Sequence, residues 1–494
     1  MAAERYDAVV VGAGAAGGWA AKELCEQGLS VLLLEAGPQL NPERDFPVPA
    51  ASERRLVARL AGCVRGQPIQ MRCSAFNART RRFFVSDRES PYTTPADRPF
   101  NWFRGRQVGG RLHVWARVVP RPSDRELEPW PLSYAELAPW YDRVEGFLGV
   151  NDVPMNPAEE RFRAAVERAF PERRVLRARV VRHDRERQPA TIRAAERTGR
   201  LTLRPNTVVR TVALDSRTGK ATGVSYVDRE SRKAGEAHGR VVILCASTIE
   251  TLRILLNSGF GNSSGQLGRG LMDHVLTGLG GPLTEAASQP DHASDPYDFG
   301  LVTGFQVPPS EDAAWGFQGA IGRGVPVWYF LAHGEMLARQ ENRVTLSERT
   351  TDAWSVPVAH VSCSPGPEEV AMAAEQLETM RELAATAGLE VRTPPSGRRL
   401  DALAFRLWRR RLLSSHGAFL PGTAAHEVGG APLGSDSRTS VLNPFGQCWD
   451  AENVFVTDGA AFPAGCWQNV TLTIMALAAR AADYIAGELA AGRV

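Results

Sequence analysis

Lysine is nearly absent from this chain of 494 residues. The 58 basic residues include lysine only at positions 22, 220 and 233, so arginine carries almost all of the positive charge. The 55 acidic residues nearly balance it, and the formal net charge at pH 7 is +3. A chain without an excess of either sign has no broad electrostatic attraction to nucleic acid or to an anionic membrane surface. We therefore expect neither as a partner.

Long hydrophobic runs and paired cysteines are missing as well. No stretch contains the roughly 18 uninterrupted apolar residues that a membrane-spanning helix needs, so no membrane span is expected. The first apolar run ends in glycines and not at a small-residue cleavage site, which argues against a signal peptide. The seven cysteines form no C-x-x-C pair, and such scattered thiols are typical of a reducing compartment. These absences predict a cytoplasmic protein.

The N-terminus contains the pattern of a strand, a glycine turn, a helix and a second strand. Residues 6–11 and 30–35 are apolar, β-rich runs, and the second ends in Glu35. Between them lie Gly12-Ala-Gly14-Ala-Ala-Gly17 and a helix-favouring segment, 16–27. The three glycines permit a tight turn, close approach of the backbone to a diphosphate, and close helix–strand packing. Glu35 can accept ribose hydroxyls, so the segment predicts an adenine dinucleotide and leaves FAD and NAD open.

A second strand-to-helix junction lies near the other end of the chain. Residues 453–458 are predicted as a strand that ends in Asp458-Gly459, and residues 470–489 as a helix that begins beside Asn469. Helix N-termini present free N–H groups to anionic ligands. Two such junctions at opposite ends of the sequence indicate that both ends meet over one cofactor, which favours the two-headed FAD over NAD.

His426 begins the sequence His426-Glu-Val-Gly429-Gly430. This is not H-E-x-x-H, so a zinc-protease site is excluded, and no metal site is predicted. The glycines indicate a tight turn that places the imidazole at the edge of a crevice. From the residues alone, a structural role explains such a histidine more often than a catalytic one.

Three segments together resemble the glucose–methanol–choline (GMC) family of flavin-dependent oxidoreductases. They are the N-terminal glycine turn with Glu35, the loop Arg104-Gly105-Arg106-Gln-Val108-Gly109-Gly110, and the stretch from His426 through Asp458-Gly459 to Asn469-Val470-Thr471. Ala246-Ser247 and Asp273-His274 match two further family elements in the family's order. Within the family, the sequences that begin at Trp102 and Trp130 are similar to bacterial glucoside 3-dehydrogenase-like, sugar-oxidising members.

The resemblance implies an α/β fold with a Rossmann-like FAD-binding domain and an antiparallel-sheet lobe, a two-domain architecture like that of p-hydroxybenzoate hydroxylase. The FAD-binding domain is expected to take residues 1–50, 100–125, 175–280 and 425–494. Residues 51–99, 126–174 and 281–424 are expected to form the substrate-binding lobe and connecting segments. Four β-rich runs predict the strands of the lobe sheet: 301–307, 328–331, 343–346 and 359–363.

The resemblance also implies roles for the matched residues. His426 is expected to take the proton of an alcohol and Asn469 to hold its oxygen, whereas Asp273 and His274 are expected to be structural neighbours of the flavin. The residues expected to contact FAD are Gly12, Gly14, Ala15, Ala16, Gly17, Glu35, Ala36, Arg104, Gly105, Val108, Gly109, Gly110, Val209, Ala246, Ser247, Asp458, Gly459, Asn469, Val470 and Thr471.

Two departures from the family pattern matter for the cofactor. Some members bind FAD covalently through a histidine at the fourth position after the second glycine of the flavin loop. Here Val114 holds that position and His113 lies one residue earlier, so noncovalent FAD is expected, and contact of His113 with the flavin is left open. The family's usual Asn-Pro is Asn469-Val470 here, which removes a proline suited to the first helical turn but keeps the asparagine.

The expected activity is FAD-dependent oxidation of a primary or secondary hydroxyl of a sugar, cyclitol or glycosylated natural product, with hydride transfer to flavin N5. A flavin-dependent lyase of the same fold, a non-catalytic flavin-binding protein and an NAD-dependent dehydrogenase are the alternatives. The sequence leaves open which polyol or glycoside is the substrate. It also leaves open whether the electron acceptor is oxygen or a dye- or quinone-like carrier.

Overall fold

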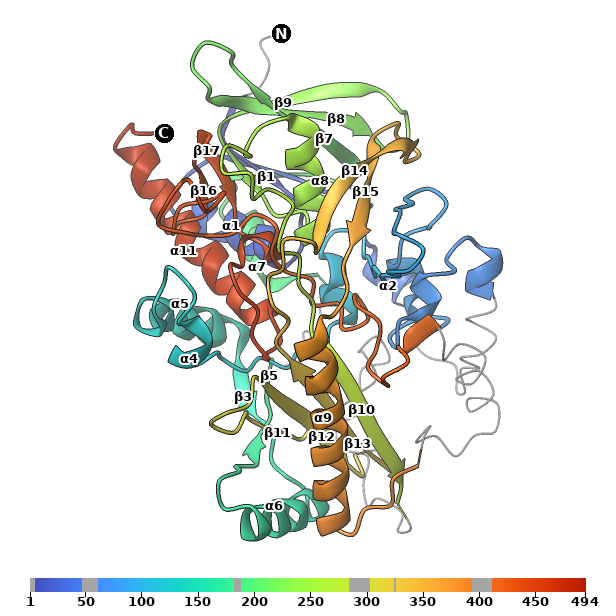
Figure 1. Ribbon diagram of the computed structural model, residues 1–494. Coiled ribbons are helices and arrows are strands. Elements are labelled where there is room, and N and C mark those ends of the chain that lie inside the picture. Colours follow the sequence, from blue (N-terminus) through green and yellow to red (C-terminus); the bar gives the residue numbers. More distant parts are fainter. Residues whose placement is uncertain (1–4, 47–60, 182–187, 284–302, 324–325, 393–410) are drawn as a thin grey trace.

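The computed structural model describes residues 5–46, 61–181, 188–283, 303–323, 326–392 and 411–494. Two main sheets organise these residues (Figure 1). The larger sheet has eight strands, with the order β16-β17-β9-β1-β2-β6 and with β8 and β7 attached through β9. Its strands are β1 (Arg5–Val11), β2 (Val31–Leu34), β6 (Leu201–Arg204), β7 (Thr207–Leu214), β8 (Ala221–Asp228), β9 (Ala234–Leu244), β16 (Gln447–Cys448) and β17 (Ala451–Val456).

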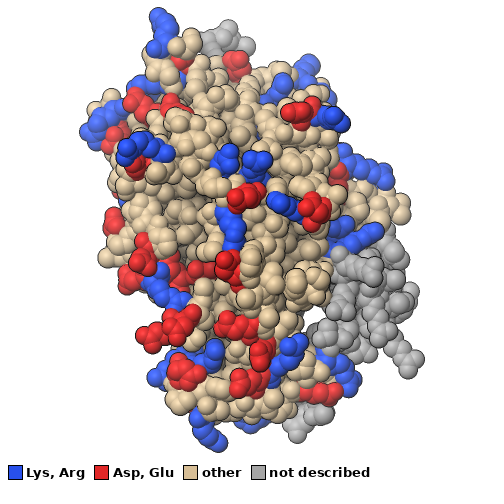
Figure 2. All heavy atoms as spheres, viewed as in Figure 1, with Lys and Arg blue, Asp and Glu red and all other residues tan. Residues whose placement is uncertain are grey.

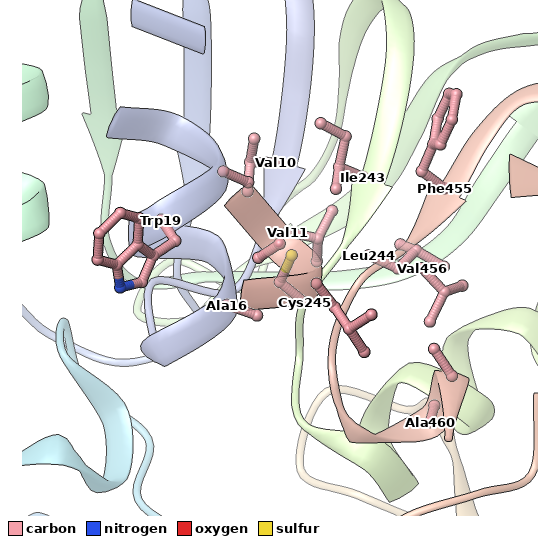
Figure 3. Packing of buried hydrophobic residues seen from close by; sticks show 14 of the residues in the cluster. Val10, Val11, Ala16, Trp19, Ile243, Leu244, Cys245, Phe455, Val456 and Ala460 are labelled. Atoms are coloured by element: carbon pink, nitrogen blue, oxygen red, sulfur yellow. The ribbon is translucent and has the colours of Figure 1, made fainter. Parts of the chain in front are cut away.

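Five adjacent strands of this sheet, β17, β9, β1, β2 and β6, run parallel. Parallel strands are covered on both faces and need nearly continuous apolar sequence, which the two predicted N-terminal runs provide. The last residues of β1, β9 and β17 (Val11, Leu244 and Val456) pair across the sheet and lie together in Figure 3. The segments that follow these strands therefore leave the sheet at the same edge.

Helices cover this sheet and join the two ends of the chain. Helix α1 (Ala15–Glu26) packs against both α7 (Ala190–Arg197) and α11 (Thr471–Ala490), and α5 (Tyr134–Leu148) packs on α11. Helix α8 (Thr248–Ser258) packs on β7. In Figure 1, the C-terminal helix α11, in red, lies beside the N-terminal unit, so the two ends of the chain belong to one body.

The second sheet is antiparallel and has five strands in the order β10-β13-β12-β11-β4. These are β4 (Leu176–Arg177), β10 (Val275–Pro282), β11 (Phe305–Val307), β12 (Trp315–Ile321) and β13 (Val327–Gly334). Helices α6 (Pro157–Ala169) and α9 (Pro367–Thr386) pack on it, and α9 crosses it in Figure 1. A separate apolar cluster that includes Phe162, Phe330 and Met380 lies under these helices, so this lobe has a core of its own.

The lobe sheet differs from the sequence prediction in its strands. The runs 301–307 and 328–331 fall on β11 and β13, although residues 301–302 lie outside the described residues. Placing 343–346 and 359–363 in the same sheet is wrong, because β14 (Arg343–Thr351) and β15 (Pro357–Ser362) form a separate two-stranded sheet. Strand β10 begins inside the range 175–280 predicted for the FAD-binding domain, yet it pairs with β13 in the lobe sheet.

Shorter elements connect these layers. They are α2 (Pro42–Asp45), α4 (Asp124–Leu127), the antiparallel pair β3 (Val150–Asp152) and β5 (Arg179–Val181), and the 3-10 turns η1 (Gln70–Arg72), η2 (Thr80–Phe83), η3 (Gly110–Val114) and η4 (Gly459–Ala461). All seven cysteines are free thiols, and only Cys63 is exposed.

The visible surface carries basic and acidic side chains interspersed with one another (Figure 2). Within the described ranges, the helices all fall short of the combined length and apolar character that crossing a bilayer requires.

Candidate active site and cofactor cavity

A cavity of about 470 Å³ lies at the carboxyl ends of β1, β2 and β9 and reaches the lobe sheet. Ligands of parallel α/β sheets bind at this edge. The structure brings most of the expected FAD contacts to the wall of this cavity from separate parts of the chain. They are Gly12, Gly14, Ala15, Ala16, Glu35, Ala36, Arg104, Gly105, Gly110, Val209, Ala246, Ser247, Asp458, Gly459, Asn469, Val470 and Thr471.

Three expected contacts, Gly17, Val108 and Gly109, do not line the cavity. The N–H of Gly109 donates to the carbonyl oxygen of Ala13 at 2.8 Å, which joins the flavin loop to the glycine turn. A Cβ on Gly17 would overlap the carbonyl oxygen of Gly12. Gly17 therefore allows the close helix–strand packing predicted from the sequence, and these residues support the wall from behind.

Three helices place their N-terminal ends in the cavity wall without a side-chain cap: α1 at Gly14, α8 at Ser247 and α11 at Val470. The first N–H groups of a helix have no partner within it and carry partial positive charge. A Cβ on Gly14 would meet no atom within 4 Å, so the backbone there is open to a ligand. This donor set fits the diphosphate of FAD.

Glu35 lies at the end of β2 and is buried, with 7% of its surface exposed. Its carboxylate accepts hydrogen bonds from the N–H groups of Ala13 at 3.0 Å and Gly37 at 2.9 Å. Burial raises the pKa of Glu35 to about 7, although these N–H donors act in the opposite direction. A carboxyl group fixed in this way has lone pairs left for ribose hydroxyls, so its geometry fits the expected contact with adenosine.

Arg104 anchors the flavin loop at the cavity wall. Its guanidinium lies 4.1 Å from the centre of the Trp102 ring and donates to the carbonyl oxygen of Ser90. Burial lowers the pKa of Arg104 to about 10, within the range in which the group stays charged at neutral pH. The cavity therefore has a fixed cation beside its apolar wall.

His113 faces away from this wall. Its Nε2 lies 2.7 Å from the carbonyl oxygen of Val108, and its ring packs against Phe46 and Phe83. His113 does not line the cavity, whereas its neighbour Val114 does. His113, the histidine nearest the family's position for covalent attachment, therefore contacts Val108, Phe46 and Phe83 behind the cavity wall.

His426 and Asn469 meet at the other end of the cavity. Nδ2 of Asn469 lies 3.5 Å from Nε2 of His426, and both residues line the cavity. The backbone N–H of His426 donates to Asp273 at 3.2 Å, and that carboxylate also accepts from the N–H of Gly422. Paired backbone hydrogen bonds between Met272 and Val428 hold the two segments side by side. The loop beside β10 therefore fixes where His426 stands.

Two further histidines surround His426. Nδ1 of His274 lies 2.9 Å from Nδ1 of His426, and the ring centre of His333 lies 5.7 Å from that of His426. Burial, with His274, His333 and Arg111 nearby, holds the pKa of His426 well below its ordinary value. Ring nitrogens of the three histidines lie within 4.8 Å of one another, but the 2.9 Å contact is a hydrogen-bond distance. His274 and His426 are therefore a hydrogen-bonded pair of imidazoles, and His333 packs beside them.

Sequence reasoning missed the lobe's part of the wall. Alternate residues of β13, Tyr329, Leu331 and His333, face the cavity, while Phe330 and Ala332 belong to the core on the other face. Gln318 of β12 pairs with Leu331 and also lines the cavity. Side chains of any strand alternate between its two faces, but the sequence does not show which face borders a ligand, because that depends on the fold.

Arg111 is a second residue of the cavity wall whose contacts the sequence did not predict. Its guanidinium donates to the Ala425 carbonyl at 2.9 Å, forms an ion pair with Glu427 at 3.0 Å, and lies 3.3 Å from the hydroxyl of Ser247. These contacts connect the flavin loop, the His426 segment and the start of α8.

A dinucleotide-binding sheet, a second antiparallel lobe and a histidine–asparagine pair in one cavity define a flavin-dependent oxidoreductase acting on alcohols. Family models described as GMC oxidoreductase match residues 6–276 and 338–478. The chain belongs to the GMC oxidoreductase family, whose members are FAD-dependent flavoproteins.

Curated relatives are similar over nearly the whole chain. A 2-methyl-1,2-propanediol dehydrogenase of Mycolicibacterium austroafricanum is 26% identical, covering 98% of this chain and 95% of the relative. A 6'''-hydroxyparomomycin C oxidase of Streptomyces lividus is also 26% identical, covering 99% and 92%. Further relatives include a fructose dehydrogenase large subunit and C-glycoside 3-oxidases. Among solved structures, a formate oxidase gives a TM-score of 0.71 at 14% identity and covers 99% of both chains.

Proposed function

We propose that this protein oxidises a hydroxyl group of a sugar, cyclitol or glycosylated natural product to a carbonyl, with His426 as the base and Asn469 as the oxygen-binding residue. The observation that carries the proposal is the 3.5 Å approach of Asn469 Nδ2 to His426 Nε2 on the wall of the FAD cavity. The family's activity on CH–OH donors and the names of the relatives support it.

Bound FAD would supply the hydride acceptor, at N5 of its ring. The side chains of the protein then have two tasks. Nε2 of His426 takes the hydroxyl proton, because burial keeps this imidazole neutral near pH 7. Nδ2 of Asn469 donates a hydrogen bond to the alcohol oxygen, and that bond strengthens as negative charge develops on the oxygen.

The lobe's part of the wall supports a hydroxylated ring as the substrate. Gln318, Tyr329 and Thr303 supply polar groups, and the Tyr329 and Thr303 hydroxyls lie 3.3 Å apart. Leu331 and Phe419 supply apolar surface beside them. A sugar ring presents hydroxyls at its edge and C–H groups on its faces, so it matches this mixture better than a plain alkyl chain does.

Candidate alcohols mixed with the holoenzyme under anaerobic conditions test the reaction. We expect sugars, cyclitols or glycosides to bleach the flavin absorbance, because oxidation of the alcohol reduces the flavin. Turnover of a substrate with no bleaching would instead indicate a lyase that leaves the flavin oxidised. Repeating the panel with a dye and with oxygen separates the acceptors, since only an oxidase forms hydrogen peroxide.

We also propose that FAD binds noncovalently, which the placement of His113 behind the wall and of Val114 at the wall supports. Acid precipitation of the holoenzyme is expected to release all of the flavin into the supernatant. A yellow pellet that keeps its flavin after washing would contradict this proposal. A His113→Ala variant then distinguishes attachment through that residue from attachment elsewhere.

A further inference from the structure

His274 connects His426 to the main chain on the side opposite Asn469. Nε2 of His274 lies 2.6 Å from the carbonyl oxygen of Cys466, and Nδ1 lies 2.9 Å from Nδ1 of His426. A carbonyl oxygen can only accept, so the proton of His274 is on Nε2. Burial lowers the pKa of His274 to about 4, so its ring is neutral near pH 7 and carries no second proton.

The polarity of the contact between the two rings follows from this. Nδ1 of His274 has only a lone pair, so Nδ1 of His426 must be the donor. His426 is neutral near pH 7 as well, because burial holds its pKa well below the ordinary value. A neutral imidazole has a single N–H, which leaves Nε2 of His426 as a bare lone pair. That nitrogen is the one beside Asn469.

We propose that His274 is a positioning residue that keeps the proton of His426 on Nδ1 and so presents Nε2 as the base. This inference rests on the proposed function, in which His426 accepts the substrate proton. When Nε2 gains that proton, the Nδ1–H bond remains in His426 and its hydrogen bond to His274 persists. No proton passes to His274, and the partner's role is to fix the tautomer and ring orientation.

The charged groups around the pair are engaged elsewhere. The carboxylate of Asp273 accepts from the backbone N–H groups of Gly422 and His426, and the carboxylate of Glu427 pairs with Arg111 at 3.0 Å. His333 packs against both rings, with its ring centre 5.2 Å from that of His274. A neutral imidazole is therefore the group that meets Nδ1 of His426, where the serine-protease triad uses a carboxylate.

Nitrogen-15 NMR of histidine-labelled holoenzyme tests the tautomer without altering His274. The His426 signals are assigned by their loss in a His426→Ala variant. We expect Nδ1 of His426 to be protonated and Nε2 to be unprotonated at pH 7. Protonation on Nε2, or rapid exchange between the two nitrogens, would overturn the proposal.

Variants of His274 test the effect on the reaction. His274→Phe keeps a ring but removes the acceptor, so we expect flavin reduction at saturating substrate to slow about ten- to hundredfold. His274→Asn can place an amide oxygen near the former Nδ1 and is expected to recover most of the rate. KM should change much less than kcat, because the substrate contacts remain.

His360→Phe is the matched control. His360 is a half-buried histidine of β15 whose Nδ1 lies 2.8 Å from the Thr93 hydroxyl, outside the FAD cavity. It should keep the wild-type rate. A wild-type rate in folded, flavin-loaded His274→Phe would overturn the inference alone, whereas a wild-type rate in His426→Ala would overturn the proposed function beneath it.

Discussion

Replacing His426 with alanine is expected to slow flavin reduction by about 10²- to 10⁴-fold, the usual contribution of a positioned general base. The substitution removes Nε2, the atom that lies 3.5 Å from Asn469 Nδ2 on the cavity wall. Asn469 remains to hold the alcohol oxygen, so KM should change less than the rate. Anaerobic stopped-flow mixing with an alcohol that reduces the wild-type flavin measures this rate directly.

The same experiment includes its controls. His426→Ala should bind a full complement of FAD and be reduced normally by dithionite, which shows that the flavin itself is intact. His238→Ala removes a partly exposed histidine of β9 that pairs with Glu236 at 3.6 Å, and should behave as wild type. Burial and the neighbouring groups lower the pKa of His426, so this base stays unprotonated at pH values where a free imidazole is charged. The flavin-reduction rate of the wild type should therefore stay constant below pH ~6.5, the pKa of a free imidazole. An unchanged rate in His426→Ala would remove His426 from the mechanism.

Many of the predicted residues that line the cavity belong to short contiguous patterns in which a strand ends or a helix begins. Gly12, Gly14 and Ala246 are placed by the strands that end immediately before them, so local pattern and strand order suffice. The predicted strands 6–11, 30–35 and 453–458 and the predicted helices 16–27 and 470–489 correspond to β1, β2, β17, α1 and α11. This part of the fold could be predicted because parallel strands and their following turns converge at one edge.

The lobe could not be predicted in the same way, because its strands contain glycine where sequence rules expect turns. Strand β10 includes Gly281, whose Cβ would overlap the carbonyl oxygen of Glu390, and β12 includes Gly319, whose Cβ would lie 2.6 Å from the Tyr329 carbonyl oxygen. Glycine at such points marks close approach of another segment, which sequence does not reveal. The face of β13 that borders the cavity was not predicted either, because the strands that pair with β13 were not known from the sequence.

The histidine cluster illustrates a second limit. Asp273 and His274 stand next to each other in the sequence but act on different atoms of His426, one on its backbone N–H and one on its ring. Their expected status as structural neighbours of the flavin stays a prediction, and the role proposed for His274 rests on its ring contact with His426. Long-range pairing between residues 152 positions apart determines that difference.

Substituting two glycines of the N-terminal turn should separate folding from cofactor binding. A Cβ on Gly17 would overlap the Gly12 carbonyl oxygen and lie 3.3 Å from Cys245 Cβ, so Gly17→Ala is expected to lower the free energy of unfolding by about 3 kcal/mol or more. A Cβ on Gly14 would have no protein atom within 4 Å, so the Gly14→Ala variant should fold as wild type. Its methyl group would instead stand in the cavity wall and weaken FAD binding at least about tenfold.

Thermal unfolding of the apoproteins and flavin titration measure the two effects independently. Gly487→Ala is the control, because Gly487 lies in α11, its Cβ would meet no atom within 4 Å, and it is outside the cavity wall. This variant should be as stable as wild type or slightly more so, since alanine favours a helix over glycine by about 1 kcal/mol. Normal FAD affinity in Gly14→Ala would mean that the diphosphate does not approach the turn at that residue. Gly14 is the N-cap residue of α1, so such a result would place the diphosphate at the N-terminus of α8 or α11, the other helix ends in the same wall without a side-chain cap.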